Sequence, residues 1–385
     1  MTRHAVWRAF FFLQTSPVPP AWNRKPVANS FAIACRAAYY GSLEHPRNLA
    51  GRTIAMKRSI LVLISLVSVV ILFGFSGVAF GQTPVTLKFA EIHEASYPTT
   101  VGDFEIARLV KERTKGRVIL EVYDGMKLGD EAVVIKKVQE GEIDLTRINI
   151  GPVTRYVPDL NAFLLPYIFR DVNHMLKVVN GRVGNDVLAS AEKNDFIGFG
   201  WFDGGTRSFY TKTMVKVPAD LKGLKIRTLQ NELMTSMVNS FGAKAIPMPH
   251  GDTYAALKDG RLDGAENNYP TYDETNHYQL AKYFIEDDHT RNPDIIIGSR
   301  KSLAAKLSPE EIEIIKQATR DAQALQFKLW AQTVQTSKDK VVAAGCVITT
   351  LTPRQKQAFV AAMKPIYDQQ PQEIKDLVKR IRAVQ

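Results

Sequence analysis

Short strand-like runs alternate with helical runs from Val85 onward, and this alternation restricts the chain to an α/β fold. The runs Val85–Ala90, Val118–Tyr123 and 143–150 are rich in the β-branched and aromatic residues that strands favour. Helical segments separate them. The second, 130–141, has Asp130 and Glu131 in its first turn and Gly141 at its end, as helix termini prefer. This order predicts a βαβαβ unit, which implies a parallel sheet with helices on its faces.

A second unit of the same kind follows. Its expected elements are a strand at 223–228, a helix at 232–241, a strand at 243–248, a helix at 250–258 and a strand at 261–267. The two units share a short pattern of glycine, aspartate three residues later and asparagine five residues after that, at Gly141, Asp144 and Asn149 and at Gly260, Asp263 and Asn268. The pattern suggests two lobes of similar build, each with an amide near the C-terminal end of a strand.

A long helical pattern begins at Ser308. The serine, Pro309 and a glutamate two positions later form a capping box with proline in the first helical turn. No glycine or proline interrupts the pattern before Gly345, and some thirty helical residues extend roughly 50 Å. One lobe does not need a helix of that length, so we expect it to run across both lobes and brace them. A strand at 347–349 and a closing helix from Thr352 are expected after it.

Residues 56–81 have the layout of a secretory signal peptide. Two basic residues follow Met56, an apolar stretch comes next, and a small-x-small site predicts cleavage between Gly81 and Gln82. An uncleaved membrane anchor is the alternative, because the apolar stretch approaches the roughly 20 residues that span a bilayer. Residues 1–55 precede a complete signal, and we interpret them as an over-extended start, with Met56 the true initiator.

The charge of the chain changes once this segment is removed. The whole sequence has 50 Lys and Arg against 39 Asp and Glu, a net charge of +11. Residues 1–81 hold nine of the basic and one of the acidic residues, so the rest has 41 against 38, a net charge of +3. That balance gives no reason to expect nucleic-acid binding. Only Cys346 remains after the cut, which excludes an internal disulfide. The expectation is an exported, soluble protein of two domains.

Templates for catalysis and for cofactors are missing from the sequence. There is no nucleophile elbow, Walker loop or HExxH motif. The histidines beyond the cut do not pair at metal-ligand spacing: His93, His174, His250, His277 and His289. We therefore expect no enzyme activity, no cofactor and no metal. Cys346 adjoins an apolar strand and is expected to be a buried, inert thiol.

Arginines near the ends of expected strands are better candidates for function. Arg227 precedes a helix, so it should lie at the C-terminal edge of a strand, where open α/β sheets bind ligands. A guanidinium can bind a carboxylate with two parallel, charge-assisted hydrogen bonds. Arg207 and Arg147 could do the same. The alternative for each is a structural or solvated arginine.

Several motifs together resemble the substrate-binding proteins of TRAP (tripartite ATP-independent periplasmic) transporters, the DctP family. They are PADLKGLKIRTLQNELM, ALKDGRLDGAENN, MKLGDEAVVIKKVQEGEIDLTRINIGP and LPYIFRD. The resemblance runs from about Val85 to the end of the chain. It implies a type II-like periplasmic binding protein with mixed sheets, flanking helices and two hinged lobes. We place lobe I at 82–204 plus 293–332, and lobe II at 205–292 plus 333–385.

The resemblance also implies a function in the periplasm. The arginine that clamps a ligand carboxylate in this family falls on Arg227, its amide partner on Asn267 and a frequent second arginine on Arg207. A small organic acid would be the ligand. The receptor, expected to be a monomer, would deliver it to the small and large membrane subunits of a sodium-driven permease.

The combination ENNYPTY and HYQLAKYF is similar to family members that bind sugar acids such as D-glucuronate or D-galacturonate. Such a ligand needs one arginine, several partners for hydroxyls and a flat aromatic face. Candidates for these roles are His93, Glu94, Asn149, Asn267, Asn268, Gln230, Trp201, Tyr210 and Tyr269. Many relatives carry proline where Leu229 and Gln230 stand here, and some have a polar residue at Ile92, which leaves the ligand open.

Three alternatives therefore remain. A C4-dicarboxylate or another short organic or keto acid would require two cationic anchors, which Arg147 or Arg207 could complete. A secreted enzyme acting on acidic sugars would use Glu94 or Glu266 as its general acid. A receptor of the same class could also serve a sensor kinase in place of a permease.

Overall fold

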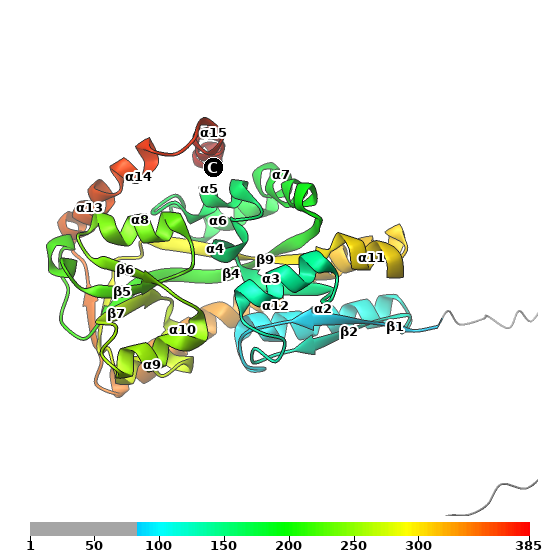
Figure 1. Ribbon diagram of the computed structural model, residues 1–385, viewed down its shortest axis with the longest axis horizontal. Helices are drawn as coiled ribbons and strands as arrows, with labels where there is room; N and C mark the ends of the chain where they lie inside the picture. Colours follow the sequence, from blue (N-terminus) through cyan, green and yellow to red (C-terminus); the bar gives the residue numbers. More distant parts are fainter. Residues whose placement is uncertain (1–82) are drawn as a thin grey trace, which may run out of the picture. The chain divides into compact units, whose positions relative to one another are not determined.

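The computed structural model describes residues 83–385. The predicted start region 1–55 and the predicted signal peptide 56–81 lie outside the described residues. Within the described chain, ten strands form one mixed sheet with flanking helices (Figure 1), which confirms the predicted α/β class. No helix of the described chain is both long enough and apolar enough to cross a membrane.

The first half of the sheet is built around the first predicted unit. Strand β1 (Val85–Ala90) lies between β2 (Val118–Tyr123) and β3 (Leu145–Asn149), and the three strands are parallel, as predicted. Strand β9 (Thr290–Ser299) pairs antiparallel with β3 and with β4 (Phe196–Thr211). The first half is therefore mixed, because a strand from far along the chain joins the parallel unit.

The second half of the sheet is built around the second predicted unit. Strand β7 (Gly264–Asn267) pairs antiparallel with β4, and β5 (Lys225–Thr228) lies between β7 and β6 (Lys244–Pro247) in parallel pairing. Strand β8 (Tyr283–Glu286) pairs with the end of β4 and with β10 (Val347–Thr350). Strand β4 thus belongs to both halves.

The pairing of β4 with β9 is interrupted between Asp203 and Thr206, near the middle of β4. Gly205 has a φ of 81° there, and an added Cβ atom would collide with the ring of Trp330. Only glycine both adopts this positive φ readily and lacks the Cβ atom that would collide with Trp330. The predicted boundary between the lobes at 204/205 falls at this irregularity, and that assignment of residues to lobes stays a prediction.

The predicted long helix is α12 (Pro309–Ala343). Its capping box is formed: the Ser308 hydroxyl accepts from the Glu311 N–H at 3.2 Å, and the Glu311 carboxylate accepts from the Ser308 N–H at 2.8 Å. Helix α12 packs against α2 (Pro98–Arg113), which follows β1, and against α10 (Tyr269–Glu274), which follows β7. One helix therefore contacts both halves, as predicted.

The shared sequence pattern has the same structural role in both units. Asp144 and Asp263 each accept a hydrogen bond from a backbone N–H of the neighbouring strand, at 2.7 and 2.8 Å. Asn149 and Asn268 are each the N-cap of the next helix, α4 and α10. The similarity supports two units of common build.

The remaining helices surround the sheet. They are α3 (Glu131–Glu140), α4 (Ile150–Val153), α5 (Asn161–Leu164), α6 (Val172–Asn180), α7 (Arg182–Ser190), α8 (Glu232–Ser240), α9 (Thr253–Lys258), α11 (Arg300–Lys306), α13 (Pro353–Ala362), α14 (Lys364–Asp368) and α15 (Gln372–Ala383), with 3-10 turns η1 (Pro158–Leu160), η2 (Ala191–Asn194), η3 (Pro218–Leu221), η4 (His250–Asp252) and η5 (His277–Gln279). One apolar cluster includes side chains of β1, β2, α2 and α12, and another those of β8, α9 and α10. Cys346 is a free thiol buried in the latter, as predicted.

Candidate ligand-binding site

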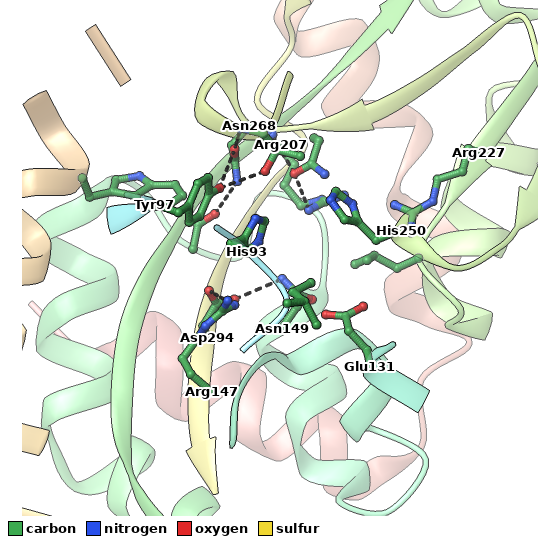
Figure 2. A pocket seen from close by; sticks show the side chains of 16 residues that line it. His93, Tyr97, Glu131, Arg147, Asn149, Arg207, Arg227, His250, Asn268 and Asp294 are labelled. Atoms are coloured by element: carbon green, nitrogen blue, oxygen red, sulfur yellow. Dashed lines mark hydrogen bonds and ion pairs between the residues drawn. The ribbon is translucent and has the colours of Figure 1, made fainter. Parts of the chain in front are cut away.

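A polar pocket lies between the two halves of the sheet, beside the C-terminal ends of β1, β3, β5 and β7 (Figure 2). About 390 Å³ of space lies between its lining atoms, part of it open to solvent. Its lining residues are Ile92, His93, Tyr97, Glu131, Arg147, Asn149, Gly204, Arg207, Arg227, Leu229, His250, Asn267, Asn268, Thr271, Asp294 and Trp330. Seven of the twelve predicted site residues are among them.

Arg147 lies on β3 and is ion-paired within the protein. Its Nε donates to Glu91 Oε2 at 2.7 Å, Nη2 donates to the other oxygen of Glu91, and Nη1 donates to Asp294 Oδ2 at 3.1 Å. Burial favours the neutral acid, but Arg147 and His93 outweigh it and hold the pKa of Glu91 below its usual value. Burial and the charge of Glu91 raise the pKa of nearby Asp103 well above its usual value. The positive charge of Arg147 is therefore compensated before any ligand arrives.

Arg207 lies on β4 and is also ion-paired. Its Nε and Nη2 bind the carboxylate of Glu266 at 2.5 and 2.9 Å. His289 lies between the carboxylates of Glu266 and Asp287. Its Nε2 is 3.4 Å from Glu266 Oε2, and its Nδ1 is 2.8 Å from Asp287 Oδ2. Burial opposes the charged forms, but these ion pairs lower the pKa of Glu266 to about 2 and raise the pKa of His289 to about 9. The two cations and two carboxylates balance.

Arg227 differs from both. Its Nε and Nη2 donate to the backbone carbonyl of Met248, at 3.2 and 2.9 Å, and among residues 83–385 no carboxylate is paired with it. Its Nη1 has no hydrogen-bond partner within the same residues. Arg227 is only 2% exposed, and this burial lowers the pKa of its guanidinium, which nevertheless remains charged. The pocket thus holds a buried cation with three N–H groups to spare, both of Nη1 and one of Nη2.

The amide of Asn267 faces the pocket with a fixed orientation. Its Oδ1 accepts from Arg207 Nη1 at 2.8 Å and from the Asn268 N–H at 2.9 Å. An atom that accepts two hydrogen bonds must be the oxygen, so Nδ2 is left as a donor and has no partner among the described residues. Asn268 itself caps α10 and donates to the Gly204 carbonyl at 2.9 Å, so its amide is already occupied.

Two further polar side chains line the pocket without a hydrogen bond to any described residue, Glu131 and His250. Glu131 opens α3 directly after the N-cap Asp130, and it is 8% exposed. Burial raises the pKa of its carboxyl group, with Arg227 acting in the opposite direction. Burial lowers the pKa of His250 well below its usual value, so its imidazole is neutral at pH 7. Figure 2 shows both side chains on the same side of the pocket as Arg227.

Five predicted site residues do not line the pocket. Trp201 is 1% exposed and packs on Phe163, with ring centroids 5.4 Å apart. Tyr210 is buried and hydrogen-bonded to His277, and Tyr269 is hydrogen-bonded to Glu286. Glu94 and Gln230 are exposed. The aromatic face of the pocket comes from Tyr97 and Trp330 instead, whose rings meet edge to face at 5.8 Å.

Two lining residues that were not predicted, Glu131 and His250, could have been found from their positions in the sequence. Glu131 and His250 each follow the C-terminal end of a parallel strand, β2 and β6, which is where such sheets bind ligands. Trp330 carried none, because it lies within a long helix and reaches the pocket only through three-dimensional packing. Asp294 could not be predicted either, because it lies in β9, a strand that was not predicted.

Among residues 83–385, Arg227 is a buried cation with no carboxylate ion-paired to it, and amide, carboxylate and imidazole groups without hydrogen-bond partners line the same pocket. This combination defines a binding site for a small, polar anion. No cluster of three or more metal-ligating side chains suited to a metal ion occurs among residues 83–385. The fold and the site are those of a two-lobed solute receptor.

The comparisons with known proteins specify the family. Residues 89–373 match the model of the bacterial extracellular solute-binding proteins, family 7, and the chain belongs to that family, as its motifs predicted. A solute-binding protein from Chromohalobacter salexigens is 36% identical over 76% of this chain and 87% of its own length.

Two solved structures have the same fold and confirm the predicted two-lobed class. Both are periplasmic solute-binding proteins of TRAP transporters. The one from Pseudomonas putida F1, with bound D-glucuronate, is 37% identical, has a TM-score of 0.75 and covers 78% of this chain and 98% of its own. The one from Xanthobacter autotrophicus Py2, with bound β-D-galacturonate, is 34% identical, has the same TM-score and covers 78% of this chain and all of its own.

Proposed function

We propose that this receptor binds a sugar acid with a single carboxylate, such as D-glucuronate or D-galacturonate. One observation carries the proposal: of the three arginines that line the pocket, only Arg227 has no carboxylate partner among the described residues. Arg147 and Arg207 are each neutralised by buried carboxylates. The pocket therefore has one positive charge to offer, which suits one ligand carboxylate.

The ligand carboxylate would accept from Arg227 Nη1 and from Asn267 Nδ2, the two unsatisfied donors at that end of the site. Arg207 would not bind the carboxylate itself. It holds the Asn267 oxygen at 2.8 Å and so aims the amide nitrogen at the ligand. Exclusion of water strengthens each of these contacts, since charges attract more strongly at a low effective dielectric constant.

Other polar groups on the Arg227 side of the pocket suit ligand hydroxyl groups. The carboxylate of Glu131 can only accept hydrogen bonds when it is ionised, and the neutral imidazole of His250 can donate one and accept one. A second ligand carboxylate near Glu131 would be repelled, whereas a sugar hydroxyl would donate to it. This arrangement favours a hexuronate over a C4-dicarboxylate. The bound ligands of the Pseudomonas and Xanthobacter proteins agree with it.

Export and delivery belong to the same proposal. The predicted signal peptide would direct the chain to the periplasm, where a monomeric receptor would present its ligand to the small and large subunits of a sodium-driven permease. No catalysis is needed for this function, and the proposal includes none.

Titration calorimetry with the exported protein tests the ligand. D-glucuronate and D-galacturonate should bind with one site per chain, and succinate and malate should bind at least a hundredfold more weakly. Tighter binding of succinate or malate would overturn the sugar-acid proposal in favour of a dicarboxylate receptor. Turnover of a uronoside during the titration would overturn the receptor function itself.

A further inference from the structure

We propose that Glu274 is a positioning residue that fastens the closed pocket from outside. It lies at the C-terminal end of α10, in the half of the sheet that carries Arg227, and it does not line the pocket. Its carboxylate contacts the segment between β1 and α2, in the opposite half. This inference rests on the proposed function in one respect: the pocket must bind a ligand that it can enclose.

Both carboxylate oxygens of Glu274 are used across the gap between the halves. Oε2 lies 2.8 Å from Nδ1 of His93, and Oε1 accepts from the backbone N–H of Glu94 at 3.2 Å. A carboxylate can only accept, so Nδ1 of His93 carries the hydrogen. The Glu274 carboxylate makes no other hydrogen bond within the described chain. Separation of the halves would leave this carboxylate without any protein partner.

The residues that Glu274 holds are themselves part of the pocket wall. His93 and Tyr97 both line it, and their rings are stacked with centroids 3.8 Å apart and planes within 5°. The hydroxyl of Tyr97 is 2.9 Å from that of Thr271, which is one helical turn before Glu274 on the same face of α10. The Glu274–His93 contact and the Tyr97–Thr271 contact therefore join the same two segments side by side.

A ligand in this pocket would be covered on one side by His93 and Tyr97. It can leave only when these rings move away from α10, which breaks the contacts of Glu274 and Thr271. The side chain of Glu274 is 23% exposed and that of His93 is 9% exposed, so the contact is largely shielded from water while the halves stay together. Glu274 should therefore slow dissociation of the ligand more than it speeds association.

Stopped-flow kinetics with the full exported protein and D-glucuronate test this role. Glu274→Ala is expected to dissociate the ligand about tenfold faster, with the association rate changed less than twofold. Glu274→Gln keeps an oxygen acceptor for one of the two partners and should fall between Ala and wild type. The matched control is Glu192→Gln, which breaks an exposed Arg–Glu pair with Arg300 away from the pocket and should leave both rates unchanged.

The outcomes separate this role from the alternatives. Equal dissociation rates in Glu274→Ala and wild type would overturn it. A slower association rate together with a lower melting temperature would assign Glu274 to general stability and also overturn it. If the wild type binds no uronate, the proposed function fails, and small-angle scattering of the ligand-free proteins then decides. A larger radius of gyration in Glu274→Ala than in Glu192→Gln would support the role of Glu274, and equal values would refute it.

Discussion

Replacement of Arg227 by methionine is expected to abolish ligand capture without weakening the ligand-free fold. Removal of one partner from a buried, hydrogen-bonded ion pair costs about 3–5 kcal/mol. The affinity for D-glucuronate should therefore fall by about two to four orders of magnitude. In the empty protein, Arg227 is 2% exposed and has no carboxylate partner among the described residues, so its burial is unfavourable. Methionine removes that cost, and water can satisfy the half-buried carbonyl of Met248.

Arg147→Met is the matched control, since it removes a pocket arginine of the same burial. Here the substitution leaves Glu91 and Asp294 buried without their shared cation, which costs about 3–5 kcal/mol of folding free energy. The melting temperature should fall by on the order of 10 °C. The two arginines thus predict opposite results: loss of binding at Arg227 and loss of stability at Arg147.

Calorimetric titration and thermal unfolding of the two variants, side by side with wild type, provide the test. Undiminished affinity in Arg227→Met would refute the carboxylate clamp. A melting temperature lowered as far as that of Arg147→Met would refute the reasoning that Arg227 is uncompensated in the empty pocket.

Three other substitutions test separate parts of the structure. Glu131→Gln should lower uronate affinity about tenfold in calorimetry, because a neutral amide accepts hydroxyl hydrogen bonds less strongly than a carboxylate; unchanged affinity would contradict its hydroxyl-binding role. The raised pKa of His289, about 9, means that its stabilising charge is present below pH 6.5 and is lost as the pH rises toward 9. The melting temperature should decline over that interval, and His289→Gln should flatten the decline; parallel curves would argue against the ion pair. Gly205→Ala should destabilise the fold by about 2–4 kcal/mol in chemical denaturation, from its positive φ and the collision with Trp330. Gly223→Ala, also at positive φ but in open space, should lose only about 1 kcal/mol, and equal losses would exclude the collision as the cause.

Much of the fold could be predicted because its signals are local. Strands β1 and β2 have the predicted bounds, and α3 begins after its Asp130 cap and ends before Gly141. Strands β4 and β9 escaped prediction, although they join the two halves. The first contains the glycine-rich run GFGWFDGG, and the second contains Pro293 within TRNPDIIIGS, so neither has a strand-like pattern. Their pairing is also non-local and leaves no trace in either segment alone.

The candidate site also contains residues that local sequence predicts and residues whose state depends on distant partners. Arg227 was predictable from its place at the end of a strand, and it lies there in β5. The state of Arg147 was not, because its partners Glu91 and Asp294 are 56 and 147 residues away in the chain. The aromatic candidates of β4, Trp201 and Tyr210, were wrongly predicted to face the pocket for a different reason. Strand β4 is buried along nearly its whole length, so alternation along it cannot separate a pocket-facing side chain from one in the core, such as Trp201.

We expect helix α12 to give the receptor an elastic restoring force. It is a continuous hydrogen-bonded rod of 35 residues, roughly 50 Å long, in contact with α2 at one half of the sheet and α10 at the other. Sharp kinks arise at proline, glycine or inserted groups, and α12 has no glycine and no proline beyond its first residue. Gentle curvature is therefore the deformation open to it. We expect opening and closing to change its bend, so that strain stored in one state drives the return to the other when the ligand leaves.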